Sequence, residues 1–240
     1  MVSCINGVEY LFDLDKSYFA AWRQLYDINI KPRYGDAFLS LKSVRQRDAK
    51  TSLYYAALCG FSNLVEQLII KYPQDANAIS GYYLTPAVAA LAGRHFEMAQ
   101  VLHRNGSSVE PRDDLKCTPL HSAAYHGNLE MVQVLLEYGV DVDCPNQHGS
   151  TPLNYAPRYG HRNAAKIARL LIERGADSNT RGYDGDTPLH QASQCGMIDI
   201  ARLLIEHGAN IEAKNDIGST PLDVARVDEM RNLLLEASAK

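Results

Sequence analysis

The sequence lacks the cysteine pattern and the charge balance of several large protein classes. Its five cysteines are scattered among 240 residues, and no two of them form a Cys-x-x-Cys pair. A small secreted domain would have an even and dense set, so we expect free thiols in a reducing compartment. The formal net charge is −4, with no excess of lysine and arginine to hold phosphates. We therefore expect no nucleic-acid partner.

Long apolar runs are also missing. No stretch approaches the roughly 20 apolar residues that a helix needs to span a bilayer. The segment MVSCINGVEYLFDLDKSYF at the start has neither the basic residues nor the apolar run of a signal peptide. We expect a cytoplasmic protein, or the intracellular part of a larger one, with no membrane partner. The composition, with 46% hydrophobic and 22% charged residues, fits a globular chain with a sizeable core.

The sequence has none of the motifs that bring catalytic groups together. It contains no glycine-rich phosphate loop, no Gly-x-Ser-x-Gly and no His-Glu-x-x-His. The closest approach to a metal site is the set His126, Cys144 and His148, but nothing in the sequence makes these three converge. Most acidic residues stand in turns, where hydrogen bonds to the backbone explain them. We expect no enzyme activity, no catalytic residue, no metal and no cofactor.

A repeated segment is the dominant feature of the chain. Thr-Pro pairs recur at a spacing of about 33 residues, and a Thr-Ser pair at residue 51 begins the same pattern one step earlier. Such self-similarity is the signature of a repeat protein. The chain therefore divides into six units, at 46–79, 80–112, 113–145, 146–181, 182–214 and 215–240.

Each unit predicts two helices and a projecting loop. In the third unit, Thr118 can cap a first helix that ends at Gly127, and Asn128 starts a second helix that ends at Gly139. The stretch 140–150 is polar and rich in turn residues, which indicates a hairpin-like loop. The second helix has one apolar stripe, formed by Leu129, Val132, Leu135 and Leu136. A single unit cannot bury this stripe, so the units must stack.

The segments TPLHSAAYHGNLEMVQVLLEYGVDVD and TPLHQASQCGMIDIARLLIEHGANIEAKNDIGS resemble the ankyrin repeat. The resemblance implies an all-α fold, an ankyrin-repeat solenoid of about six stacked helix–loop–helix units with β-hairpin-like loops over 46–240. It also implies that His121 and His190 are structural and tie adjacent repeats together through hydrogen bonds near the threonine.

Three places depart from the repeat. Arg94 stands where other units have glycine, and we expect the preceding Gly93 to take over the positive φ. Tyr72-Pro73 replaces the glycine after a second helix, so that helix should end differently. Pro157 falls inside a first helix and should kink it. Three extra residues follow near 161–163, either as tolerated drift in a loop or as a hinge or specificity element.

The two ends differ from the other units. Residues 1–45 predict a helical N-terminal extension, which either caps the first repeat through Trp22 and its neighbours or forms an interface with another domain. The last unit replaces the glycine-containing joint with the segment 226–229 and adds charged residues, as a C-terminal cap that faces water would do.

The resemblance also implies where a protein or peptide partner binds. In ankyrin proteins the loop tips and the exposed side of the first helices form a concave surface, and here those positions vary among units that otherwise agree. The predicted partner-binding residues are Tyr82, Tyr83, Leu84, Asp114, Leu115, Tyr125, His126, Gln147, His148, Arg158, Tyr159, Tyr183, Asp184, Asp186 and Gln194. We expect a monomer.

Two non-catalytic functions fit the sequence. The segments 53–73 and 81–109 resemble the ankyrin arrays of fungal multidomain proteins, in which such arrays often follow a NACHT-type nucleotide-binding domain. This implies the sensing or adaptor arm of a larger signalling protein, although the chain itself has no phosphate-binding loop. The alternative is a stand-alone regulatory inhibitor or substrate adaptor of an enzyme.

Overall fold

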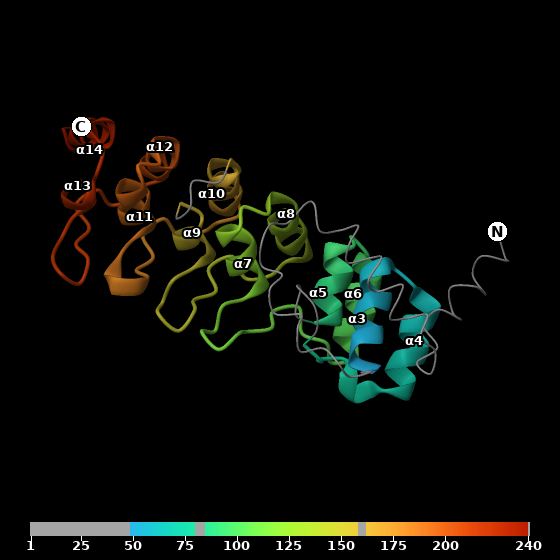
Figure 1. Cartoon of the computed structure of the whole chain (residues 1–240). Helices are drawn as coiled ribbons and strands as arrows, with labels where there is room; N and C mark the ends of the chain where they lie inside the picture. Colours follow the sequence, from blue (N-terminus) through green and yellow to red (C-terminus); the bar gives the residue numbers. More distant parts are fainter. Residues whose placement is uncertain (1–48, 80–84, 158–161, 240) are drawn as a thin grey trace. The chain divides into compact units, whose positions relative to one another are not determined.

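The computed structural model describes residues 49–79, 85–157 and 162–239 (Figure 1). The predicted N-terminal extension at 1–45 lies outside these residues. The contacts divide the chain into two compact parts, the first part up to Ser108 and the second part from Val109. All regular secondary structure in the described ranges is helical. This confirms the predicted all-α fold.

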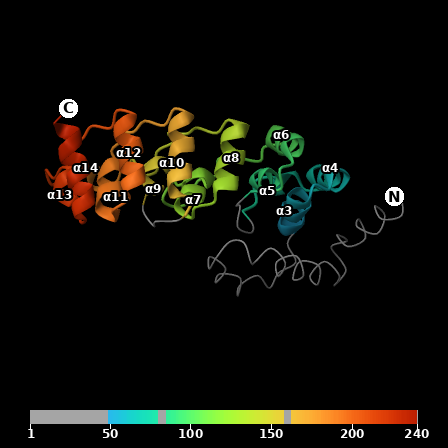
Figure 2. The same ribbon diagram turned by 90° about the horizontal axis from the view of Figure 1, so that it is seen from above.

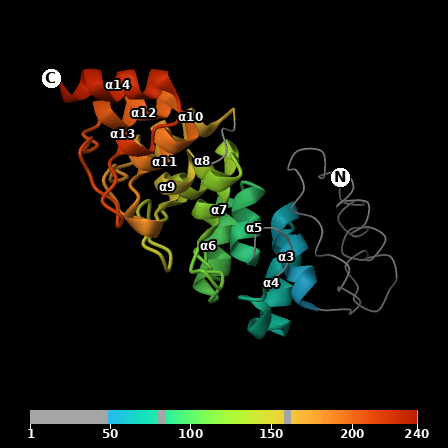
Figure 3. The ribbon, with the colours of Figure 1, turned by 60° about the vertical axis from the view of Figure 1, so that its left-hand side comes forward.

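The first part, up to Ser108, contains two helix pairs. Helices α3 and α4 form the first pair and α5 and α6 the second, and α3 also packs along α5 (Figure 3). A short 3₁₀ helix, η3, follows α4. The bounds are Ala49–Cys59 for α3, Ser62–Lys71 for α4, Pro73–Asp75 for η3, Pro86–Ala92 for α5 and Phe96–Arg104 for α6.

The second part, from Val109 onward, contains four helix pairs in two rows. The first helices α7, α9, α11 and α13 form one row and the second helices α8, α10, α12 and α14 the other, with the helices of each row in contact (Figure 2). This is the serial stacking that the repeat predicts. The bounds are Pro119–Tyr125, Pro152–Tyr155, Pro188–Cys195 and Pro221–Val224 for the first row, and Leu129–Tyr138, Ala164–Glu173, Ile198–Glu206 and Asp228–Ser238 for the second.

In five of the six repeats the threonine begins the first helix as predicted, whereas Thr51 of the first repeat lies inside α3. The Thr118 side chain accepts the backbone N–H three residues later, while the His121 side chain accepts the backbone N–H of Thr118. Such a capping box satisfies two donors that a helix start leaves unpaired. The same arrangement recurs at Thr151 with Asn154, at Thr187 with His190 and at Thr220 with Asp223.

One packing position is alanine in all six units. It lies five residues after the threonine, and every copy is buried. The small side chain lets neighbouring first helices approach closely, which explains why the residue type is the same in each unit. The copies are Ala56, Ala90, Ala123, Ala156, Ala192 and Ala225.

The histidine of the TPLH segment joins one repeat to the next. Burial lowers the pKa of His121, so the ring is neutral. Its Nδ1 accepts from the Thr118 N–H, so Nε2 holds the proton and donates to the carbonyl oxygen of Ser150 at 3.0 Å. His190 Nε2 donates in the same way to the carbonyl oxygen of Ser219 at 2.9 Å. The predicted structural role of both histidines is confirmed.

A second set of hydrogen bonds joins the turns that follow the second helices. Eight residues before each threonine, a side-chain oxygen accepts the backbone N–H of the equivalent turn in the next repeat. The four bonds run from Ser108 to Asn77 at 2.6 Å, from Asp141 to Glu110 at 3.0 Å, from Asp177 to Asp143 at 3.0 Å and from Asn210 to Asn179 at 2.7 Å.

The expectation that Gly93 takes the positive φ is wrong. Gly93 has φ −76° and Arg94 itself has φ +61°. Position 93 is glycine for a different reason, because a Cβ there would lie 2.4 Å from the carbonyl oxygen of Leu58. The glycine is therefore needed for the close packing of α3 and α5, and Arg94 adopts the left-handed conformation at the joint.

The other two departures have different outcomes. The helix before Tyr72 does end differently, since Tyr72 leaves the helix at φ −136° and η3 follows. The predicted kink at Pro157 is wrong. Helix α9 ends at Tyr155, before the proline, because a residue without an N–H cannot extend the hydrogen bonds of so short a helix. The three-residue insertion falls partly on residues 158–161, outside the described ranges.

Candidate functional site

Four loops precede the first helices of the second part of the chain. We call them fingers 3 to 6, after the repeats to which they belong. They lie beyond the row of first helices, on the side away from the second helices (Figure 1). A backbone hydrogen bond closes each finger between its first and last residues, at 2.9 to 3.1 Å. The fingers are Asp113–Cys117, Asn146–Ser150, Gly182–Asp186 and Asn215–Ser219.

In three fingers the first residue also holds the turn with its side chain. Oδ1 of Asp113, of Asn146 and of Asn215 each accepts two backbone N–H groups from its own finger. Finger 5 begins with Gly182, which has no side chain for this role, and its Asp184 adopts φ +56°. Finger 5 is therefore built differently from the other three.

Hydrogen bonds connect each finger to the next. The Gln147 N–H donates to the carbonyl oxygen of Leu115 at 2.9 Å, and the Asp216 N–H donates to that of Asp184 at 3.0 Å. Between fingers 4 and 5 the bond differs, because the Tyr183 N–H donates to the Ser150 hydroxyl at 3.0 Å. These bonds hold the fingers as a row of fixed loops.

The tips of three fingers expose large apolar side chains beside aspartates. The side chains of Leu115, Tyr183 and Ile217 are 48%, 55% and 83% exposed. Asp114 and Asp184, which are also exposed, are adjacent in sequence to Leu115 and Tyr183. On finger 4, His148 contacts the Tyr183 ring edge-on with 5.2 Å between ring centroids. A surface of this kind offers apolar contact and negative charge together.

The first helices add aromatic residues to the finger side of the second part. The half-buried Tyr125 contacts His126 and Tyr155 edge-on, with ring centroids 4.9 and 5.9 Å apart. The Tyr155 hydroxyl accepts a hydrogen bond from Asn146 Nδ2 at 2.9 Å, so α9 is tied to finger 4. Gln194, on α11, is half-buried. The structure thus places Tyr125 in a cluster whose other tyrosine was not predicted.

A small pocket lies between finger 5 and the helices α9 and α11. Its volume is about 30 Å³, more than the roughly 10–15 Å³ that a cavity needs to hold one water molecule. Two tyrosines and the Asp186 carboxylate contribute to its wall, together with neutral polar groups. The lining residues are Ser150, Asn154, Tyr155, Gly182, Tyr183, Asp186 and Gln191.

Ten of the fifteen predicted partner-binding residues fall in the described ranges. They all lie on fingers 3 to 5 or at the ends of α7 and α11, and Gln147, His148, Tyr183 and Asp186 form the contacts given above. The other five lie outside the described residues: Tyr82, Tyr83, Leu84, Arg158 and Tyr159.

The sequence interpretation missed Asn154, Tyr155 and Gln191 of the pocket. Tyr155 and Gln191 stand four residues after the threonine, a position that has five different residue types in the six units. That variation was the available signal, because positions that only pack, such as the invariant alanine, do not vary. Asn154 replaces the histidine of TPLH and was hidden by its structural role.

The described part of the chain has no group of three or more histidine, cysteine, aspartate or glutamate side chains placed to hold a metal ion. Cys144 is buried, and burial raises the pKa of its thiol. Among the same residues, no helix has the length and apolar character needed to span a bilayer.

The comparison with family models identifies the repeat. The model described as "Ankyrin repeats (3 copies)" matches residues 53–146, 87–181, 140–215 and 166–240, which together cover most of the chain. No curated protein matches the sequence. Ankyrin repeats are generally non-catalytic modules for protein–protein interaction. The paired helices, the capping boxes and the family match agree with one another, and the chain belongs to the ankyrin repeat family.

Proposed function

We propose that the chain is a non-catalytic scaffold that binds a protein or peptide partner on a concave surface formed by the fingers and the exposed ends of the first helices. We further propose that it serves as the sensing or adaptor arm of a larger signalling protein. The scaffold presents a surface and carries out no covalent step.

The contrast between variable and constant positions carries this proposal. The alanine five residues after each threonine is constant and buried, whereas the finger tips differ from unit to unit and expose Leu115, Tyr183 and Ile217. Exposed apolar side chains cost solubility and add nothing to the core, so a row of them is best explained by contact with a partner. Tyrosine is also enriched among the residues that dominate binding energy.

The rigidity of the fingers supports the same conclusion. Backbone bonds within and between fingers, together with the bond from Asp216 N–H to the Asp184 carbonyl, fix the tips before a partner arrives. A surface that is already ordered loses less conformational entropy on binding. The fingers can therefore give specific binding without rearrangement.

A triple substitution tests the proposal. Leu115→Ser, Tyr183→Ser and Ile217→Ser together remove the apolar tips without touching the buried alanines. Leu235→Ser is the matched control, because Leu235 is 53% exposed on α14 in the row of second helices. Each protein is immobilised and exposed to an extract of the source cell, and captured proteins are quantified by mass spectrometry.

We expect wild type and Leu235→Ser to capture the same partner in near-stoichiometric amounts. The triple variant should retain roughly a tenth or less, since the few residues at the centre of an interface that dominate binding each contribute more than about 1 kcal/mol. Equal capture by the triple variant, with an unchanged helical circular-dichroism spectrum, would remove the finger surface from consideration.

A further inference from the structure

We infer that the pocket beside finger 5 is a specificity site for one basic side chain, lysine or arginine, of an extended partner segment. This rests on the proposed function and adds to it the chemistry of the partner. The pocket combines a carboxylate, two aromatic rings and a local break in the repeat.

The pocket exists because finger 5 departs from its neighbours. A Cβ on Gly182 would lie 2.5 Å from the Ser150 hydroxyl, so a side chain at this position would push into the space that the pocket occupies. The Tyr183 N–H uses that hydroxyl in place of a carbonyl of finger 4. Glycine at the start of the finger and the hydroxyl of Ser150 therefore shape the opening together.

Asp186 gives the pocket its negative charge. The equivalent residues, each directly before a threonine, are Cys117, Ser150 and Ser219, which carry no formal charge. The Asp186 oxygens accept from Asn215 Nδ2 at 2.9 Å and from Gln191 Nε2 at 2.8 Å. Both donors are neutral amides, so they orient the carboxylate without neutralising it.

The charge of Asp186 is available to a partner. In the described part of the chain, the salt bridge of this region joins Arg181 to Asp216 at 2.8 Å, and Asp186 forms none. Each carboxylate oxygen has a second lone pair and can accept one more donor. Asp184, on the same finger, adds a further exposed carboxylate close in sequence.

The aromatic walls select a cation over a neutral donor. Tyr183 and Tyr155 line the pocket, and a positive charge is attracted to an aromatic face within about 6 Å. The volume of about 30 Å³ exceeds what one water molecule needs but is too small for a whole side chain, so the end of one side chain fits. An ammonium or guanidinium group matches the charge, the donors and the size, while its apolar stem can lie along the exposed Tyr183.

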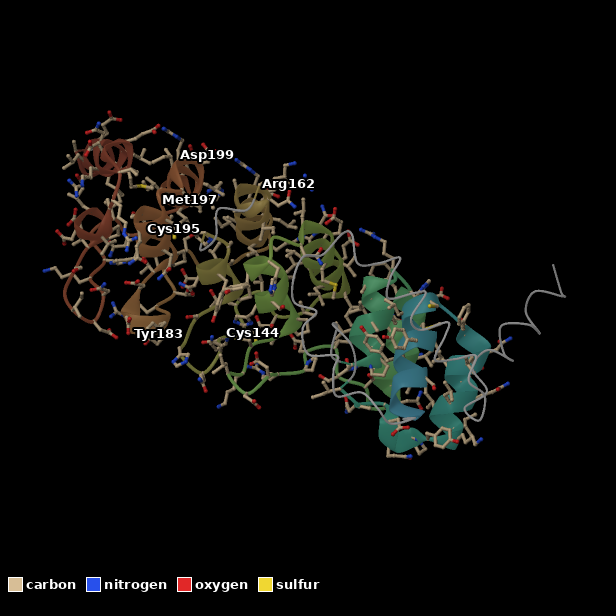
Figure 4. The ribbon with its side chains drawn as sticks, in the orientation of Figure 1. Cys144, Arg162, Tyr183, Cys195, Met197 and Asp199 are labelled. Carbon is tan, nitrogen blue, oxygen red and sulfur yellow. The ribbon has the colours of Figure 1, made fainter. Side chains whose placement is uncertain are left out.

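Selection of peptides from a displayed random 12-residue library on the full chain tests the inference. Asp186→Ser removes the carboxylate and installs the residue that units 4 and 6 have at this position. Asp199→Ser is the control, because it makes the same charge change on α12. Figure 4 shows Asp199 and Tyr183 on opposite sides of the second part of the chain. Affinities of one enriched synthetic peptide are then measured by calorimetry.

We expect the enriched peptides to share one lysine or arginine at a fixed place. Asp186→Ser should weaken the chosen peptide by at least about tenfold, and Asp199→Ser by less than about twofold. Replacing the shared basic residue with alanine should weaken binding similarly, and Asp186→Ser should then add no further loss.

Two results would overturn the inference. Enriched peptides without a shared basic residue, or equal affinity for wild type and Asp186→Ser, would show that peptides bind elsewhere on the surface and would leave the proposed function intact. Failure to enrich any peptide would also overturn it, because a pocket for a peptide side chain must select one. The capture experiment with the finger variants decides the proposed function separately.

Discussion

The Asp143 carboxylate accepts the backbone N–H of Asp177 at 3.0 Å, across the junction between two repeats. Asn179 accepts the equivalent bond one repeat later, and its Nδ2 also donates to the carbonyl oxygen of Gly208 at 3.1 Å. Asp143 cannot make that second bond when it is ionised. Burial, and then the charges of Asp177 and Asp141, raise its pKa.

Asp143→Asn should therefore stabilise the protein at pH 7. The raised pKa means that ionised Asp143 opposes folding above the pKa of an unfolded aspartate, and that wild type gains stability as the pH falls through the raised value. We expect a gain of at most about 1 kcal/mol in the free energy of unfolding at pH 7, because water screens the partly exposed carboxylate, and the gain should shrink toward acid pH. Urea denaturation measures it. The reverse change, Asn179→Asp, should destabilise, and a gain there would refute the explanation.

His121 makes stability fall on mild acidification. Burial holds the pKa of His121 below the ordinary value for a histidine, so as the pH falls the unfolded chain takes up a proton that the folded chain does not. His121→Asn imitates Asn154, which makes the same cap but reaches the next finger only at 3.4 Å. The variant should lose about 1 kcal/mol at pH 8 and show a flatter decline between pH 7 and 5. Parallel declines for the two proteins would contradict this.

The Ser193 hydroxyl is buried without a hydrogen-bond partner. The third unit has Ala124 at the same place, so the site accepts alanine. Ser193→Ala should raise the free energy of unfolding by about 1 kcal/mol, because a buried unpaired hydroxyl costs about that much. Ser122→Ala, at an exposed position of α7, is the control and should change little. Lower stability of Ser193→Ala in thermal melts would show that the hydroxyl has a partner in solution.

Arg94 and Gly93 give opposite expectations at one joint. Arg94→Gly should raise stability by about 1 kcal/mol, because a left-handed conformation costs a residue with a Cβ about that much. Gly93→Ala should lower stability, because the new Cβ would meet the Leu58 carbonyl. Chemical denaturation of both variants measures the pair. Stabilisation by Gly93→Ala would show that the two helices are not packed so closely.

Much of the fold could be predicted because repetition makes each unit a copy of the same local physics. The Thr-Pro pairs, Gly127, Asn128 and Gly139 each have a conformational role that can be read from the residue type, and the helices begin and end there. The early end of α9 could not be predicted from propensity alone, because it depends on whether a short helix continues through Pro157 or stops before it.

The candidate site was predicted less completely than the fold. Tip positions such as Tyr183 follow from their place in the repeat, which is why most of the described ones lie together. The need for glycine at position 93 depends on the Leu58 carbonyl of another helix, and the pocket depends on Gly182 meeting Ser150 across two fingers. Contacts between residues distant in sequence decide both, and no pattern within one unit encodes them.

Amide hydrogen exchange of the chain, alone and in complex with the captured partner, tests the central claim most directly. The account predicts that the partner slows exchange mainly in 113–117, 146–150, 182–186 and 215–219 and leaves α8, α10, α12 and α14 unchanged. Protection confined to those second helices, with the four fingers exchanging as in the free chain, would contradict the claim that the fingers bind the partner.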